Sequence, residues 1–221
     1  MATQYAFGKI VTDGLVLCLD AADRNSYVSG STTWFDVAGS NNGTLTNGPT
    51  FNTGSGGNIV FDGGDDYINI PSNTNIPVAN SQYSISVWFS ATSFGAGGLV
   101  GWGAYNSGNA VTALRFNGNG FRHYWWGNDL DVALSMSTNT WYNVIAQYNG
   151  TTRQVFLNAQ VVGQDTPAGH NVPYATNLTV GVTNTSEYLS ARIGIAQIYN
   201  RALTADEVLQ NYNAQKSRFG L

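Results

Sequence analysis

The densest concentration of residues able to bind a ligand lies between Arg115 and Asp129, where aromatic, basic and amide side chains follow one another. Aromatic rings stack on the apolar faces of sugars, while Asn, Asp, Arg and His side chains hydrogen-bond sugar hydroxyls, so this mixture suits a shallow groove for glycans. A nearby glycine-rich loop adds two further aromatic residues. The candidate ligand-binding residues are Trp102, Tyr105, Arg115, Arg122, His123, Tyr124, Trp125, Trp126, Asn128 and Asp129.

Two other interpretations of the same residues stay open. Trp, Tyr and Arg are also typical of hydrophobic cores and of interfaces between subunits, and the sequence favours neither a glycan nor a protein partner. Trp125 and Trp126 are adjacent, and successive side chains of a strand point to opposite faces, so at most one of them lies in the core. The other serves as a platform for a ligand or as a contact between subunits.

Catalytic chemistry has little support in the sequence. Glycoside hydrolysis needs two carboxylates about 5 to 9 Å apart, one acting as acid and the other as base or nucleophile. Asp129 and Asp131 alternate onto one face and form the best such pair, so a polysaccharide-acting glycosidase is an alternative function. Neither histidine has a recognisable triad around it, and Cys18 lies in an apolar run typical of a buried thiol. We therefore predict that the protein is not an enzyme.

The elements that would position these residues are mostly strands. Short apolar runs alternate with clusters of Gly, Asn, Ser and Thr, and Asn-Gly pairs, which favour turns, recur along the chain. The clearest hairpin joins 141–148 to 151–157 through a tight type I′ turn at Asn149-Gly150. The other predicted strands are 14–20, 57–62, 66–70, 83–90, 98–103, 111–117, 121–126, 131–135, 160–164, 178–183 and 191–199.

One helix is predicted, over 204–215. Thr204 followed by Glu207 reads as a capping box, in which the threonine is the N-cap and the glutamate reaches back to its amide. The helix would close the fold without carrying chemistry. The residues expected on its packed side are Val208, Leu209 and Tyr212.

Composition narrows the classes of partner. The 221 residues are 43% hydrophobic but only 10% charged, with a net charge of −4, so the surface must be built from neutral polar side chains. The few Lys and Arg residues form no cluster, which argues against nucleic-acid binding. The start of the chain lacks a secretory signal and no segment is long enough to span a membrane, so we expect a protein made without a Sec-type address. With no linker-like break, we predict a single domain over 1–221, beginning with an arm over 1–12.

Several segments, in order, resemble the laminin-G-like, concanavalin A-like jelly rolls. They are 13–21, 34–39, 60–68, 83–89 and 198–208, which read DGLVLCLDA, WFDVAG, VFDGGDDYI, YSISVWF and IYNRALTADEV. The resemblance extends from about residue 13 to about residue 213. It implies an all-β, two-sheet antiparallel jelly-roll sandwich with one short C-terminal helix. It says less about function, because this fold carries lectins, glycosidases, adhesion modules and viral surface proteins.

The resemblance also brings two acidic loops near each other, which predicts a structural calcium site. Its hard oxygen ligands would come from Asp20, Asp23, Asp36 and Asn41. Asx turns explain the same residues without a metal, and we prefer them. Two departures matter: Ile195-Ala196-Gln197 replaces an acidic pair found in many relatives, and Asn158-Ala159 stands where Asn-Gly is common.

The neutral, Asn-, Thr- and Gly-rich composition is similar in style to virion-associated proteins of tailed bacteriophages. We therefore predict a non-catalytic protein of the virion surface, either a capsid decoration or a fibre, or else an extracellular protein exported by another route. It would adhere to glycans on a cell surface or to capsid or tail proteins, as a homo-oligomer or attached to a larger assembly. A purely architectural oligomer is the remaining alternative.

Overall fold

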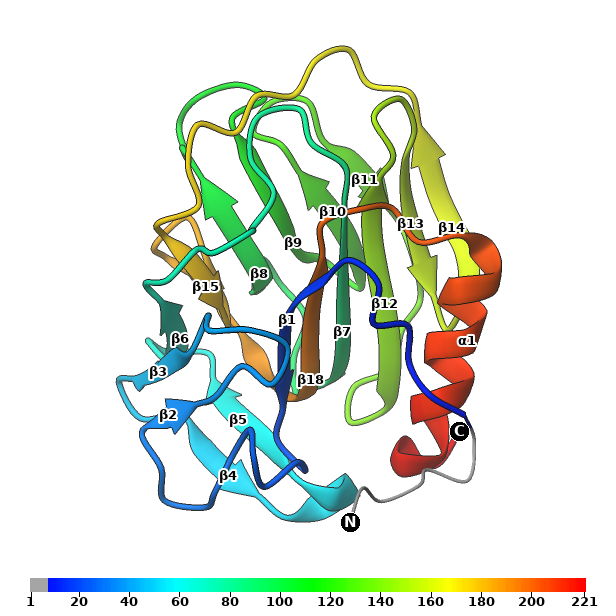
Figure 1. Ribbon diagram of the computed structural model, residues 1–221. Helices are drawn as coiled ribbons and strands as arrows, with labels where there is room; N and C mark the ends of the chain where they lie inside the picture. Colours follow the sequence, from blue (N-terminus) through cyan, green and yellow to red (C-terminus); the bar gives the residue numbers. More distant parts are fainter. Residues whose placement is uncertain (1–7) are drawn as a thin grey trace.

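The computed structural model describes residues 8–221, which form two antiparallel sheets packed face to face (Figure 1). The sheet beside the C-terminal helix is here called the helix-side sheet. Its strands follow the order β14 (Gln160–Asp165), β13 (Arg153–Leu157), β12 (Trp141–Tyr148), β7 (Tyr83–Ala91), β18 (Ser190–Tyr199), β5 (Asn58–Asp62), β4 (Thr50–Asn52). Outside this order, β1 (Leu15–Asp20) pairs with β18. The other sheet, here the open-side sheet, has the order β11 (Leu130–Val132), β10 (Gly120–Tyr124), β9 (Val111–Asn117), β8 (Gly98–Gly103), β15 (Leu178–Val180), β6 (Tyr67–Ile70), β3 (Gly43–Thr46), β2 (Thr33–Trp34). The predicted two-sheet antiparallel jelly roll is confirmed.

The core lies between the sheets. It is built from the side chains that point inward, which are every second residue of each strand. Ile85, Val87 and Phe89 of β7 are all fully buried there. The Phe89 ring meets Phe116 of β9 at 5.2 Å and Phe121 of β10 at 5.8 Å, both edge-on. Each such phenylalanine removed from water stabilises the fold by roughly 1.5–3 kcal/mol, so these contacts hold the two sheets together.

Helix α1 (Ala205–Gln215) and the 3₁₀ turn η2 (Lys216–Phe219) cover the outer face of the helix-side sheet (Figure 1). The Trp88 ring, on that face of β7, stacks on Tyr212 at 5.6 Å and on Phe219 at 4.4 Å. The predicted capping box is confirmed, with Thr204 and Glu207 each bonding the other's backbone. The prediction that Leu209 packs inward is wrong, since 46% of it is exposed. Asn211 takes the buried position and bonds the Tyr199 hydroxyl.

One hairpin turn differs from the sequence prediction, and the turn at Asn158-Ala159 is strained, as the replacement of Asn-Gly there predicts. The β12–β13 connection is a four-residue loop and not a type I′ turn, because Tyr148 pairs with Arg153. Within the loop, Asn149 Oδ1 accepts hydrogen bonds from the backbone amides of Thr151 and Thr152. The β13–β14 connection is the tight one. Asn158 and Ala159 have φ of 48° and 64°, so an alanine there occupies the left-handed region that costs a non-glycine residue about 1–2 kcal/mol.

Some strand limits also differ. The predicted strand 178–183 is interrupted at Gly181, whose φ is 90° and whose missing Cβ makes room for the Phe61 ring. The predicted strand 121–126 ends at Tyr124, and 131–135 is reduced to β11. The short strands β2, β3 and β4 carry too few apolar residues to be recognised by alternation. Of the predicted arm, residues 1–7 lie outside the described residues, and Val11 donates its amide to Asn211 of α1.

A buried polar cluster joins the two sheets at the end of the sandwich where β13 begins and β14 ends. The Arg153 side chain has no exposed surface and forms two hydrogen bonds with the Asp165 carboxylate, at 3.0 and 2.6 Å. A third bond goes to the backbone oxygen of Asn128 at 2.7 Å, and the guanidinium lies 4.3 Å over the Trp125 ring. One cation thus joins an edge strand to the turn that follows β10.

Two histidines lie in the same cluster. His123 meets the Tyr83 hydroxyl at 2.6 Å, and the His170 ring stacks on Trp125 at 3.8 Å while its Nε2 bonds the backbone oxygen of Val111. Burial lowers the pKa of His170 to about 4. The hydrogen bond to Val111 opposes this shift, and the positive charge of Arg153 adds to it. Burial, reinforced by the charges of Arg153 and His170, also holds the pKa of His123 well below its ordinary value. Both imidazoles are therefore neutral in the folded protein near pH 7.

Acidification should therefore destabilise the fold before its carboxylates titrate. Unfolded histidines take up protons near pH 6.5, whereas the folded ones resist, so stability is complete above about pH 6.5 and falls as the pH drops toward 4. His170 alone contributes a loss of about 3 kcal/mol over this window. Urea unfolding at about pH 7 and about pH 4.5 measures the change. The His170→Gln variant should show a shallower pH dependence; an unchanged slope would contradict the assignment.

Candidate functional site

The outer face of the open-side sheet is free of the helix and carries a row of small and polar residues across six strands. Strand register places them side by side in one line. From β3 to β10 the row is Thr44, Asn69, Thr179, Gly101, Ala113 and Tyr124. The middle residues of the row, Thr179, Gly101 and Ala113, have small side chains. They leave a flat surface on the sheet, here called the floor, on which other parts of the chain can lie.

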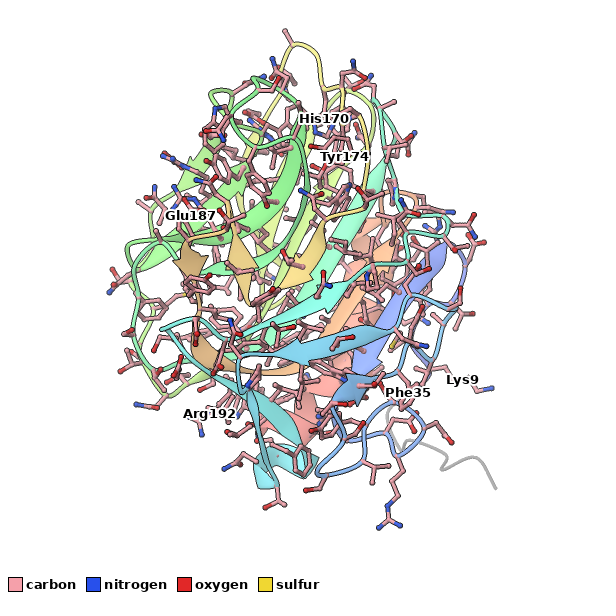
Figure 2. All side chains as sticks on the ribbon, turned by 90° about the vertical axis from the view of Figure 1, so that its left-hand side faces the viewer. Lys9, Phe35, His170, Tyr174, Glu187 and Arg192 are labelled. Carbon is pink, nitrogen blue, oxygen red and sulfur yellow. The ribbon has the colours of Figure 1, made fainter. Side chains whose placement is uncertain are left out.

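A small hairpin lies flat on this floor. It consists of β16 (Val182–Thr183) and β17 (Glu187–Tyr188), here called the cover hairpin together with its turn at 184–186. A Cβ at Gly98 would stand 2.3 Å from the Thr183 amide nitrogen, and one at Gly101 would stand 2.9 Å from the Thr183 methyl group. The two glycines therefore allow the hairpin to approach β8. Figure 2 turns this side toward the reader and labels Glu187 beside the strands of the sheet.

Tyr105 lies between the cover hairpin and an aromatic group at the β10 end. Its hydroxyl occupies the space above Gly101, where a Cβ would stand 2.4 Å away. Its ring is 6.2 Å from both Tyr124 and Trp126, and Trp126 stacks on Tyr124 at 5.5 Å. Burial raises the pKa of the Tyr105 hydroxyl, and the nearby charge of Glu187 adds to this. This tyrosine is therefore a neutral, fixed wall.

A pocket of about 220 Å³ opens between the cover hairpin and the strands β6 and β15. Three tyrosine rings and three asparagine amides surround it, with no charged residue among those that line it. The lining residues are Tyr67, Asn69, Tyr105, Asn177, Thr179, Val182, Asn184, Thr185 and Tyr188.

The polar groups of this pocket fall into two sets. Asn177 bonds both backbone groups of Gly103, and the Thr179 hydroxyl bonds the backbone oxygen of Val182, so these two hold the structure. Among the described residues, no hydrogen bond engages the side chains of the second set. That set consists of Tyr67, Asn69, Asn184, Thr185 and Tyr188. These half-buried or exposed groups are the ones available to a ligand.

The tip of the cover hairpin holds a strained backbone. Asn184 and Thr185 have φ of 47° and 55°, and a β-branched threonine rarely adopts this region. The cost is of order 1–2 kcal/mol for such a residue. Strain of this kind concentrates at binding sites, where the surrounding structure enforces it.

Charged side chains lie beside the pocket in paired form. Arg122 makes two 2.7 Å bonds to Asp131 and lies 3.7 Å from Asp129, whose other oxygen accepts the Trp125 amide. The hydrogen bonds from Arg122 lower the pKa of Asp131, so this carboxylate is ionised at neutral pH. Both members of the suggested catalytic pair are thus engaged, and Asp131 is unsuited to donating a proton.

Arg115, the cross-strand neighbour of Arg122, faces the cover hairpin. Its Nη1 lies 3.6 Å from Glu187, and its guanidinium lies 5.0 Å over the Tyr124 ring. Glu187 in turn accepts a 2.6 Å bond from the Thr183 hydroxyl. The hairpin is thereby attached to β9 by charge as well as to β8 by close packing.

The predicted ligand-binding residues separate onto two faces. Three of them lie in the core and present no surface, which corrects their assignment as ligand contacts: Trp102, His123 and Trp125 are 0% exposed. The two indole nitrogens are bonded inside: Trp102 donates to the backbone oxygen of Pro77 and Trp125 to the Tyr83 hydroxyl. The remaining predicted residues lie on or beside the outer face. They are Tyr105, Arg115, Arg122, Tyr124, Trp126, Asn128 and Asp129.

Trp126 reaches that face by a backbone reversal. Its φ is 64°, which takes the chain out of strand geometry directly after the buried Trp125. Asn128 bonds Asn109 through its side chain and Arg153 through its backbone, so the turn is fixed from both sides. The two adjacent tryptophans therefore belong to different layers of the protein.

The predicted calcium ligands do not converge. Asp36 accepts the amides of Cys18, Ala38 and Asn41, while Asn41 bonds Val16 and Thr74. Each side-chain oxygen of these two residues thus already accepts at least one backbone amide.

The other two predicted ligands are also engaged. Asp20 is paired with Arg218, whose positive charge opposes a cation there, and Asp23 caps the Asn25 amide. The Asx-turn interpretation therefore fits and the calcium prediction is wrong for these four residues. Within 8–221, three carboxylates at ligand spacing occur instead in the loop after β5, at Asp62, Asp65 and Asp66.

Apart from Tyr105, which was predicted, the pocket residues were not recognised in the sequence because they come from two separated segments, 67–69 and 177–188. Tyr67 and Asn69 alternate with the buried Ile68 and Ile70, so a polar outward face on β6 was the available signal. Asn184 and Tyr188 carry no comparable pattern, since their position depends on how the cover hairpin folds back over β8.

Comparisons with known proteins agree on the architecture. A family model described as the concanavalin A-like lectin/glucanases superfamily matches residues 62–209. A comparison with curated protein sequences finds no match. Among the described residues, no helix has the length and apolar character needed to cross a bilayer.

Several solved structures share the fold at low identity. Domain 4 of an extracellular arabinanase from Geobacillus stearothermophilus, in complex with arabinotriose, is 18% identical with a TM-score of 0.67, covering 90% of this chain and 98% of that one. The binding domain of Paraclostridial mosquitocidal protein 1 is 16% identical with a TM-score of 0.72, covering 92% and 52%. Trypanosoma rangeli sialidase is 16% identical with a TM-score of 0.69, covering 93% and 33%. The chain thus spans about a third of the sialidase.

Replacing Gly101 tests the packing that builds the pocket. The Gly101→Ala change places a methyl group against the Tyr105 hydroxyl, Ala113 and Thr183, so we expect a loss of about 1–3 kcal/mol in unfolding free energy. Urea unfolding followed by tryptophan fluorescence measures it. Gly95→Ala is the matched control, because a Cβ there meets nothing within 4 Å. Equal stability of both variants would show that the cover hairpin does not press on β8.

Proposed function

The chain belongs to the concanavalin A-like lectin/glucanase superfamily, and on this basis we propose that it is a carbohydrate-binding module that holds a glycan without cleaving it. The binding site is the pocket between the cover hairpin and strands β6 and β15. The observation that carries the proposal is the presence there of half-buried tyrosine rings together with amide and hydroxyl groups that have no partner among the described residues.

The chemistry of this pocket matches what a sugar offers. A pyranose or furanose ring has an apolar C–H face and a rim of hydroxyls, so its binding needs a flat ring and several neutral donors and acceptors. Tyr67 of β6 and Tyr188 of the cover hairpin supply rings, and Asn69 and Asn184 supply amides. The strained turn at Asn184 and Thr185 holds one of those amides at the rim.

The structural relatives support a role in glycan binding. The arabinanase domain matches over nearly its whole length and carries arabinotriose, which makes a stand-alone sugar-binding domain the most direct analogy. The mosquitocidal protein match is likewise a binding domain. The sialidase is a larger enzyme, of which this chain corresponds to a third, so its catalytic activity is the weaker analogy.

The absence of cleavage is part of the proposal. Its support is the engagement of Asp129 and Asp131 by Arg122 and the Trp125 amide, which leaves neither carboxylate available as the acid that glycoside hydrolysis requires. The glycosidase alternative would need these contacts to break when substrate binds.

The virion location stays a prediction from composition, as do capsid, tail and homo-oligomer partners. The low charge and the neutral polar surface support an exposed module in a particle. Co-sedimentation of the protein with assembled particles is the measurement that tests it, and a protein found only free of particles would contradict it.

A glycan array followed by calorimetry on its best ligand tests the binding proposal. Tyr188→Ala removes one ring and should weaken binding at least tenfold, and Asn184→Ala should weaken it by a similar factor, because about 1.4 kcal/mol corresponds to tenfold. Tyr188→Ala should unfold near the wild-type temperature, since its hydroxyl has no internal hydrogen bond among the described residues, whereas Asn184→Ala puts an alanine at a φ of 47° and should lower that temperature slightly.

The matched control is Gln164→Ala, in a polar hollow of the helix-side sheet, which should bind as the wild type does. Wild-type affinity in Tyr188→Ala would move the site elsewhere, and an array without any bound glycan would remove the proposal. The bound glycan should be recovered intact after incubation.

A further inference from the structure

The pocket and its surroundings differ in charge, and this difference bears on the class of sugar. Tyrosine, asparagine, threonine and valine make up the whole lining of the pocket. No lysine or arginine is available there to bind a carboxylate, a sulfate or a phosphate. Carbohydrates that carry such groups are normally held by a cation, with Arg preferred for its bidentate geometry.

The two arginines of β9 and β10, on the outer face beside the cover hairpin, are already engaged. Arg122 is bonded twice to Asp131 and lies close to Asp129. Arg115 has only 9% of its side chain exposed, and a ligand carboxylate would have to displace Glu187 to pair with it. Displacing Glu187 would also break its bond to Thr183, which holds the cover hairpin together.

Carboxylates outnumber arginines in the ion-paired group on the β9–β11 side of the cover hairpin. Glu187, Asp129 and Asp131 carry three negative charges against the two positive charges of Arg115 and Arg122. Glu187 is adjacent to Tyr188, a wall of the pocket, and its charge acts on Tyr105, another wall. An anionic sugar in the pocket would therefore meet repulsion without a compensating cation.

We infer that the pocket selects one uncharged sugar unit and rejects its uronic acid counterpart, with Glu187 as the residue that enforces the rejection. This inference rests on the proposed function, because it names the class of sugar that the same site takes. The volume of about 220 Å³ is below the roughly 300 Å³ from which pockets for drug-sized ligands begin, so it suits a single ring and not a longer segment.

Matched sugars test the inference on the whole chain. The probes are methyl glucoside with methyl glucuronide, and methyl galactoside with methyl galacturonide, because each pair differs only by a hydroxymethyl or a carboxylate group. Arabinotriose serves as a further neutral probe. We expect calorimetry or saturation-transfer NMR to show the neutral member bound at least tenfold more tightly. Its affinity should not change between about 50 and 500 mM salt, since a neutral ligand has no charge to screen.

Two charge variants separate the role of Glu187 from the net charge of the protein. Glu187→Gln keeps the acceptor for Thr183 but removes the charge and the ion pair with Arg115, so it should reduce the ratio of neutral to uronate affinity severalfold, and this ratio is the readout. Asp206→Asn changes the net charge equally from an exposed position on α1 and should leave the discrimination as it is.

The outcomes are distinguishable. A uronate bound as tightly as its neutral partner would overturn the inference while leaving the proposed function in place. Equal discrimination in Glu187→Gln and the wild type would remove Glu187 from the inference. If neither arabinotriose nor any methyl glycoside binds the wild type, the proposed function itself fails.

Discussion

The buried pairing of Arg153 with Asp165 is the constraint on which the end of the sandwich near the candidate site depends. A guanidinium with no exposed surface is stable only if its donors are matched, and here they are matched by the end of β14, by the backbone of Asn128 and by the ring of Trp125. The turn after β10 is thereby held in one place. From this follow the burial of Trp125, the reversal at Trp126 and the position of the aromatic group on the outer face.

The two sheets use their outer faces differently. On the helix-side sheet, Trp88 is covered by Tyr212 and Phe219, which completes an apolar layer under α1. On the open-side sheet, the glycines of β8 replace large side chains and allow the cover hairpin to lie close to the strands. The same jelly roll therefore has one face closed by packing and another on which loops can build a pocket, so its binding properties can change without loss of the core.

The sequence was informative where structure depends on local alternation and poor where it depends on long-range placement. The alternating Ile85, Val87 and Phe89, and the Thr204–Glu207 capping box, are local patterns with one physical outcome. The aromatic run was recognised but its two faces were not separated, because the burial of His123 and Trp125 depends on Tyr83 from another sheet. Pocket residues such as Asn184 could not be recognised, since a hairpin lying on glycines leaves no periodic signal.

The two ends of the described chain lie on the same side of the molecule. The Gln210 side chain of α1 bonds the backbone of Lys9, and the last residues follow directly after η2, so both ends lie by the helix (Figure 1), whereas the pocket lies against the open-side sheet. The two described ends and the pocket thus lie on different sides of the sandwich. A support joined at either end would present the pocket outward, and many copies fixed in this way would display their pockets in parallel. Weak individual contacts would then add up through effective concentration.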